Sequence, residues 1–120
     1  MSVFYRLIIT LILPLVAQQA LAIQLTDPRS AAVYLQQQRP LINACLHEAQ
    51  ASNHLPDIWR SQACQQLLDQ DSQLKTAWQL ILPNGTTKGL AQVPYGLRQL
   101  TVDTYSEYKQ LAERIAQLSR

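Results

Sequence analysis

The residue types best suited to metal or redox chemistry lie in one short segment of the chain. Both cysteines, Cys45 and Cys64, mark its ends, and both histidines, His47 and His54, lie between them. Such a segment could hold a metal ion, a reactive thiol pair or a structural disulfide. On a helix each residue turns by about 100°, so His47 would point about 200° away from Cys45 and could not share a metal ion with it. A redox pair would need Cys-x-x-Cys spacing. The pattern therefore favours a disulfide and predicts no metal site and no cofactor.

Residues 1–22 have the layout of a cleaved secretory signal peptide, which would provide the oxidising environment that a disulfide needs. Arg6 precedes a largely apolar run at residues 7–17, and an Ala-Leu-Ala segment ends at Ala22. We therefore expect cleavage after Ala22 and a periplasmic or secreted protein. The alternative is an uncleaved membrane anchor, but Gln18 and Gln19 interrupt the apolar segment.

After cleavage, residues 23–120 would form one small domain with balanced charge. The chain has ten Lys and Arg and eight Asp and Glu, so nine basic and eight acidic side chains remain without Arg6. The basic residues are scattered along the sequence, whereas nucleic acids and acidic membranes require clustered positive charge. We therefore expect neither a nucleic acid nor, after cleavage, a membrane as a partner. A domain of this size has a modest core that a disulfide would stabilise.

A hairpin of two antiparallel helices would bring the two cysteines together. We expect the first helix to end near residues 50–52 and the second to begin at Pro56, which suits a first helical turn. In two antiparallel helices, the residue numbers of two facing residues always add up to the same value. For Cys45 and Cys64 the midpoint falls between the two helices, so the thiols face each other. A disulfide here would stabilise the fold by about 3 kcal/mol in the chain-entropy model.

The same register matches apolar residues on either side of the cysteines. It places Leu35 opposite Leu74 and Ala31 opposite Trp78, and these residues recur at helical spacing within each arm. The second arm is expected to reach Leu82, with a break near residues 69–72.

Two prolines and one Asn-Gly pair indicate further boundaries of helices. Asp27 followed by Pro28 predicts the start of the first helix, which Pro40 would kink or divide, and Arg39 before that proline is expected outside helical geometry. Asn84 and Gly85 are a strong turn signal. We expect a helix up to Leu82 followed by a long loop; the alternative is a β-hairpin formed by residues 77–82 and 87–93.

The C-terminal region predicts one more helix. Thr104 and Glu107 have the spacing of a capping box, and apolar residues from Tyr105 onward follow at intervals of three and four, forming one face that would pack on the core. The sequence therefore predicts an all-α domain, in which this helix packs against a disulfide-linked antiparallel hairpin. With the β-hairpin at Asn84–Gly85 the fold would instead be α+β.

The expected function follows from the catalytic motifs that the sequence lacks. It contains no nucleophile elbow, no phosphate-binding glycine loop and no zinc-binding histidine pair. We expect a non-enzymatic exported protein that binds an envelope protein, as an assembly factor, an inhibitor or immunity-type protein, or a chaperone. The alternatives are a minor cell-wall hydrolase with paired carboxylates, which would need a cleft, and a membrane-anchored component of an envelope complex.

The partner-binding residues are expected in the loop at residues 83–100. Loops of this length tend to carry function. Tyr95 and Arg98 belong to residue types that often dominate binding energy at interfaces, and Leu90 lies close to them in the sequence. Trp59, early in the second cysteine helix, could be a further surface contact.

Overall fold

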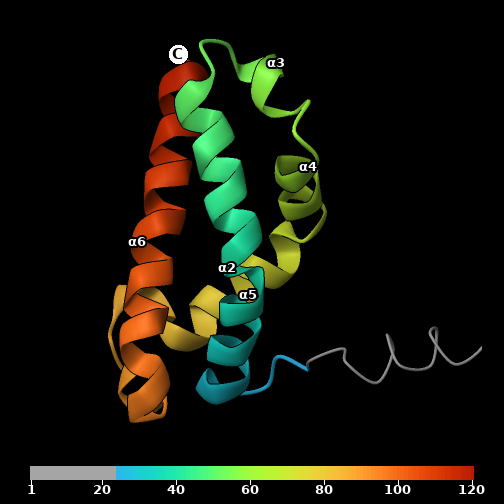
Figure 1. Cartoon of the computed structure of the whole chain (residues 1–120). Helices are drawn as coiled ribbons and strands as arrows, with labels where there is room; N and C mark the ends of the chain where they lie inside the picture. Colours follow the sequence, from blue (N-terminus) through green and yellow to red (C-terminus); the bar gives the residue numbers. More distant parts are fainter. Residues whose placement is uncertain (1–23) are drawn as a thin grey trace, which may run out of the picture.

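The computed structural model describes residues 24–120, and every regular element in this part of the chain is helical (Figure 1). The elements are α2 (Pro28–Ala51), α3 (Leu55–Ile58), α4 (Gln62–Asp69), α5 (Asp71–Ile81), the short 3₁₀ turns η1 (Pro83–Gly85) and η2 (Leu90–Gln92), and α6 (Tyr95–Leu118). The all-α class is confirmed. The predicted signal peptide lies outside the described residues.

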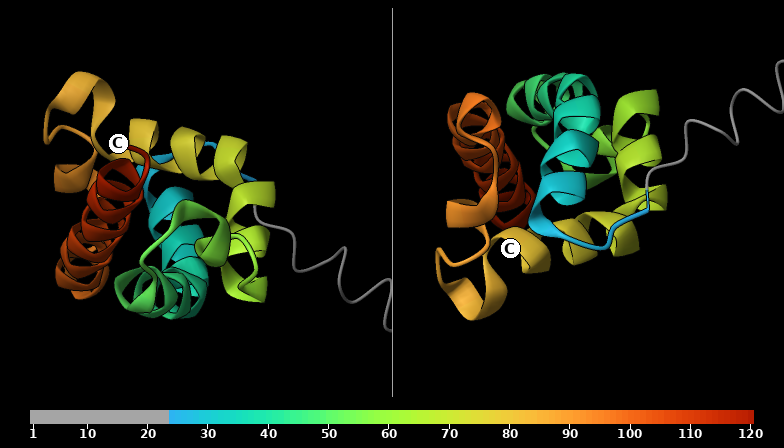
Figure 2. Two further views of the ribbon diagram at one scale, coloured as in Figure 1. Left: turned by 90° about the horizontal axis from the view of Figure 1, so that it is seen from above. Right: turned by 90° about the horizontal axis from the view of Figure 1, so that it is seen from below.

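Two long helices form the frame of the molecule. α2 and α6 lie side by side and run in the same direction, and they make the most extensive contacts of any two elements (Figure 1). After α2 the chain returns through α3 and α4, which lie on the other side of α2 from α6. It then runs past α2 along α5 toward the start of α6 (Figure 1 and Figure 2). The segment expected as one returning helix is therefore three short ones. The break at Gln70 lies where it was expected, but the break between Ile58 and Gln62 was not predicted.

α2 begins as the sequence predicts. The Asp27 carboxylate accepts a hydrogen bond of 2.7 Å from the Ser30 backbone N–H, and the Ser30 hydroxyl oxygen accepts one from the Asp27 N–H. Hydrogen bonding of the carboxylate by Ser30, first by its backbone N–H and then by its side chain, holds the pKa of Asp27 below its usual value. Pro40 does not divide the helix, and Arg39, expected to leave helical geometry, stays within α2.

The region around Asn84 differs from the β-hairpin alternative. Residues 77–93 contain no strand, because α5 continues to Ile81 with its apolar residues at helical spacing on the buried side. Asn84 and Gly85 form a tight turn with φ values of 53° and 78°. Both angles fall in the left-handed region that asparagine and glycine tolerate best.

α6 begins nine residues before the predicted capping box. Thr104 is fully buried, and its hydroxyl donates a 2.7 Å hydrogen bond to the carbonyl of Leu100 within the same helix. Thr101 does the same with Leu97. These bonds satisfy the hydroxyl groups, so both threonines can face the core, and Thr104 is a core residue rather than an N-cap. Residues 83–100 are therefore not one long loop.

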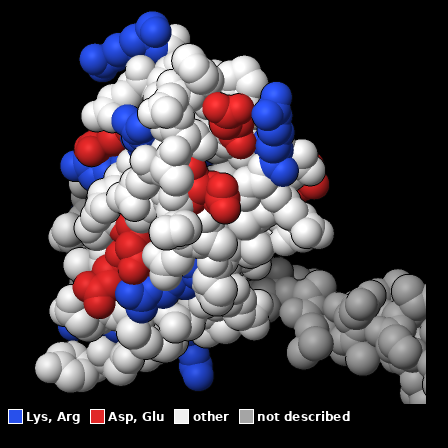
Figure 3. Space-filling model, turned by 45° about the horizontal axis from the view of Figure 1, so that its top comes forward, with Lys and Arg blue, Asp and Glu red and all other residues white. Residues whose placement is uncertain are grey.

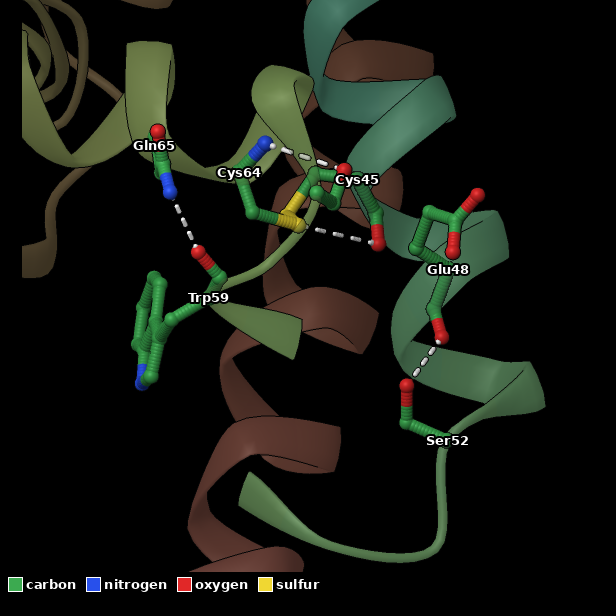
Figure 4. Close-up of a disulfide and its surroundings, with 7 residues drawn as sticks. Cys45, Glu48, Ser52, Trp59, Cys64 and Gln65 are labelled. Atoms are coloured by element: carbon green, nitrogen blue, oxygen red, sulfur yellow. Dashed lines mark hydrogen bonds between the residues drawn. A yellow bond between two sulfur atoms is a disulfide. The ribbon is translucent and has the colours of Figure 1, made fainter. Parts of the chain in front are cut away.

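The disulfide between Cys45 and Cys64 is confirmed, and it lies in the core. It joins α2 to α4, with Cα atoms 4.8 Å apart and side chains no more than 1% exposed (Figure 4). It belongs to one apolar core to which every α-helix, and Val93 before α6, contribute buried residues. The largest completely buried ones are Leu35, Ile42, Ile58, Ile81 and Val93.

Two arginines attach α6 to α2. Arg39 donates two hydrogen bonds, of 2.8 and 3.0 Å, to the carboxylate of Glu107. Arg114 donates to the carbonyls of Ala49 (3.0 Å) and Ser52 (2.7 Å), which lie where α2 ends. Glu107, expected in a capping box, thus forms an ion pair with a neighbouring helix instead. No helix within residues 24–120 combines the length and apolar character needed to cross a bilayer.

Candidate functional site

Large apolar side chains are exposed along the first half of α6. Tyr95 is 87% exposed, Val102 41% and Tyr105 39%. With Arg98 they lie at intervals of three or four residues, so they share one face of the helix. Leu90 of η2 lies beside them, because it lines the same cavities as Arg98 and Val102. We call these five residues, Leu90, Tyr95, Arg98, Val102 and Tyr105, the α6 patch.

Arg98 holds the loop before α6 in place. Its Nη2 atom donates hydrogen bonds of 3.1 Å to the carbonyls of Ala91 and Val93, and its guanidinium carbon lies 5.9 Å from the centre of the Tyr95 ring. Nε is buried without a partner among residues 24–120. Nη1 also lacks a partner there, but it is not buried. The guanidinium therefore has an unpaired N–H edge at the surface.

Two adjoining cavities give the α6 patch its shape. One has a volume of about 280 Å³ and is lined by Leu90, Tyr95, Arg98, Gln99 and Val102. The other, of about 220 Å³, extends from Leu90 and Val102 to Tyr105 and to Leu82 at the end of α5. Because they share Leu90 and Val102, they form one groove between η2 and α6.

An aromatic cluster supports the far end of this groove. The Tyr105 ring meets Trp78 edge-on, with ring centroids 5.2 Å apart, and Tyr108 packs on the same indole at 5.5 Å. Burial, and then the negative charge of Asp71, raise the pKa of Tyr108. Tyr105 therefore packs on Trp78 while the residue stays 39% exposed.

Trp59 lies apart from the other three predicted binding residues. It is half-buried after α3, and its carbonyl accepts a 2.6 Å hydrogen bond from Gln65 (Figure 4). It lines a cavity of about 100 Å³ over the disulfide, together with Leu68 and Ile115. Ile115 lies twenty residues after Tyr95 on α6, about 30 Å along the helix. The structure therefore brings Leu90, Tyr95 and Arg98 together but not Trp59.

The groups considered for catalysis do not converge. Within residues 24–120, no three His, Cys, Asp or Glu side chains are close enough to hold a metal ion. His47 and His54 are exposed, whereas Cys45 is buried. Among the five best-formed cavities of residues 24–120, one is lined by a carboxylate, that of Asp71, which pairs with Lys75 at 2.8 Å. None is lined by the two carboxylates that glycoside hydrolysis requires.

Charges are mixed on the face that Figure 3 shows. Blue basic and red acidic side chains alternate there among neutral residues, with no extended area of one sign. This face therefore lacks the basic surface that binds nucleic acid.

The comparisons with known proteins give no relative: no family model, curated protein or solved structure matches this chain.

Sequence reasoning missed Val102 and Tyr105 as members of the patch. Tyr105 was expected on the buried face of a helix beginning at Thr104. The signal that would have revealed both is the spacing of Tyr95, Arg98, Val102 and Tyr105, which becomes helical only if the helix begins at Tyr95.

Proposed function

We propose that this chain is an exported, non-enzymatic protein that binds a partner protein through the α6 patch. The observation that carries the proposal is the concentration of exposed apolar side chains on one helix face, of which Tyr95 is the most exposed. A contiguous apolar surface costs free energy in water, and in small proteins it commonly marks an interaction site.

Contacts beneath the α6 patch hold its side chains in place, which favours a binding surface. Arg98 ties η2 to α6 through two carbonyls, and Tyr105 rests on Trp78. A surface that is already ordered loses little conformational entropy when a partner binds. In this proposal the disulfide joins α2 to the returning chain, and this hairpin with α6 packed on it serves as the scaffold.

Export is part of the proposal. A buried disulfide is typical of proteins that mature in an oxidising compartment. Mass spectrometry of the protein recovered from the periplasm or medium tests this step. We expect a mass that begins at Ile23 and includes one disulfide; a chain that retains residues 1–22 would instead favour the membrane-anchored alternative.

Partner binding can be tested with three immobilised proteins exposed to the envelope fraction of the source cells. They are the oxidised wild type, a double variant with Tyr95→Ala and Val102→Ser, and Leu68→Ser as a matched control. Leu68 is 56% exposed on α4, outside the patch. All three substituted side chains are exposed, so thermal unfolding should change little in either variant.

We expect a protein that is retained by the wild type and the control but at least about tenfold less by the double variant, because central aromatic residues dominate interface energies. Equal retention by all three proteins, or none by the wild type, would contradict the proposal.

A further inference from the structure

Positive charge outnumbers negative charge beside the α6 patch. Asp103, between Val102 and Tyr105, is the one acidic residue in residues 72–106, and it accepts a 2.9 Å hydrogen bond from Gln99. Residues 72–102 include Lys75, Lys88 and Arg98 but no Asp or Glu. Lys75 is neutralised by Asp71, whereas Lys88 is exposed in the loop beside η2, and no ion pair is formed by Lys88 or Arg98 within the described chain. Lys88 and Arg98 outweigh Asp103, so the groove keeps a small net positive potential.

Arg98 provides a specific contact point for an anion in the groove. Its two intramolecular hydrogen bonds both use Nη2, which leaves the surface-exposed Nη1 as a donor. The cavity at this position is otherwise lined by Leu90, Tyr95, Val102 and the polar Gln99. A carboxylate placed there would meet a guanidinium partly surrounded by apolar groups, where charge-assisted hydrogen bonds are strongest.

The start of α6 adds to the preference for an anion. α6 has no side-chain N-cap, since Pro94 precedes it, and the N–H groups of Tyr95 and Gly96 have no side-chain acceptor. These groups carry the positive end of the helix dipole. They lie in the turn before Arg98, and Tyr95 of that turn lines the same cavity as Arg98.

We infer that the partner presents an acidic side chain, Asp or Glu, flanked by apolar side chains, and that Arg98 binds its carboxylate while the groove binds its neighbours. Arg98 lies within the patch, with Tyr95 before it and Val102 and Tyr105 after it, over roughly 15 Å of helix. A C-terminal carboxylate would leave one side of the patch uncovered, whereas an acidic side chain within a continuing segment covers both. This inference rests on the proposed function.

The test uses NMR titration of the oxidised, exported protein with three capped or free peptides. The first is acetyl-Ala-Leu-Glu-Leu-Ala-amide, the second replaces Glu by Gln, and the third is acetyl-Ala-Leu-Gln-Leu-Ala with a free C-terminal carboxylate. We expect the Glu peptide to shift the Arg98 Nε–H and Tyr95 backbone signals and to bind at least about tenfold more tightly than the Gln peptide. Equal binding of these two peptides, or stronger binding of the free C-terminus, would overturn the inference.

Matched variants separate this inference from the proposed function. Val102→Glu puts a carboxylate one turn from Arg98, where it would pair with the guanidinium and repel an acidic ligand; Val102→Gln has the same shape without the charge. We expect Val102→Glu to abolish binding of the Glu peptide and to reduce retention of the envelope partner about tenfold further than Val102→Gln does. If both variants retain the partner equally while the Tyr95 and Val102 double variant loses it, the proposed function stands and the inference fails.

Discussion

Arg39 and Glu107 show how much a single pair of side chains depends on its surroundings. From the neighbouring sequence, Arg39 was expected outside helical geometry because Pro40 follows it, and Glu107 was expected in a capping box. In the fold they form a two-point ion pair between α2 and α6, with each side chain about one quarter exposed or less. The hydrogen bonds and charge of Glu107 raise the pKa of Arg39, so the arginine stays charged at all ordinary pH values.

We expect this pair to stabilise the fold more than an exposed pair does. A double-mutant cycle with Arg39→Gln and Glu107→Gln should give a coupling energy of about 1 kcal/mol, because the geometry is two-point and the pair is partly shielded from water. The matched control is Asp71 and Lys75, an exposed pair one turn apart on α5, for which about 0.3–0.5 kcal/mol is expected. Urea unfolding of the four proteins in each cycle measures both values. A larger coupling for the control would contradict the ranking.

At the scale of elements, the segment between α5 and α6, residues 82–94, depends on close backbone contact. A Cβ atom at Gly89 would lie 2.0 Å from the carbonyl oxygen of Leu80 and 2.6 Å from that of Ile81. Both atoms belong to the backbone of α5 and cannot move aside. The loop can therefore cross the end of α5 only with glycine at this position, although its φ of −70° is ordinary for any residue.

The two glycines nearest the start of α6 should respond to alanine in opposite ways. Gly89→Ala should lower the free energy of unfolding by about 1–3 kcal/mol or more, because the backbone of α5 must shift. Gly96→Ala should raise it by about 0.4–1 kcal/mol, because Gly96 lies in the first turn of α6 with open space around it. Thermal or urea unfolding compares them directly. Destabilisation by Gly96→Ala would show that α6 does not begin at Tyr95.

At the scale of the whole molecule, the disulfide is the one covalent link between α2 and the returning chain. It closes a loop between positions 19 residues apart. Both sulfur atoms lie in the core, where reductants have little access to the folded protein.

Removing this link should cost more than any surface change discussed above. The double variant Cys45→Ala and Cys64→Ala should unfold with a free energy about 3 kcal/mol lower than the oxidised wild type in the chain-entropy model. Reduced wild type, prepared by unfolding in reductant and refolding, is the control that keeps both sulfur atoms, and it should lose a similar amount. An unchanged urea midpoint in both proteins would contradict a stabilising role for the disulfide.

The sequence by itself determined the features that depend on neighbouring residues and covalent chemistry. The cap at Asp27, the end of α2 near Ser52, the buried disulfide and the all-α class all follow from local preferences or from a helical spacing that the fold preserves. Leu90, Tyr95 and Arg98 also lie together as expected, since they are close in the sequence.

Only the tertiary structure decided where α6 begins and what its first half does. Residues 95–103 include a glycine in the first turn and have no capping side chain, so their local preference for a helix is weak. Packing of the Thr101 and Thr104 side chains against the core provides the missing stabilisation. That packing turns Val102 and Tyr105 outward beside Arg98 and so creates the α6 patch, because a helix that buries one face must expose the other.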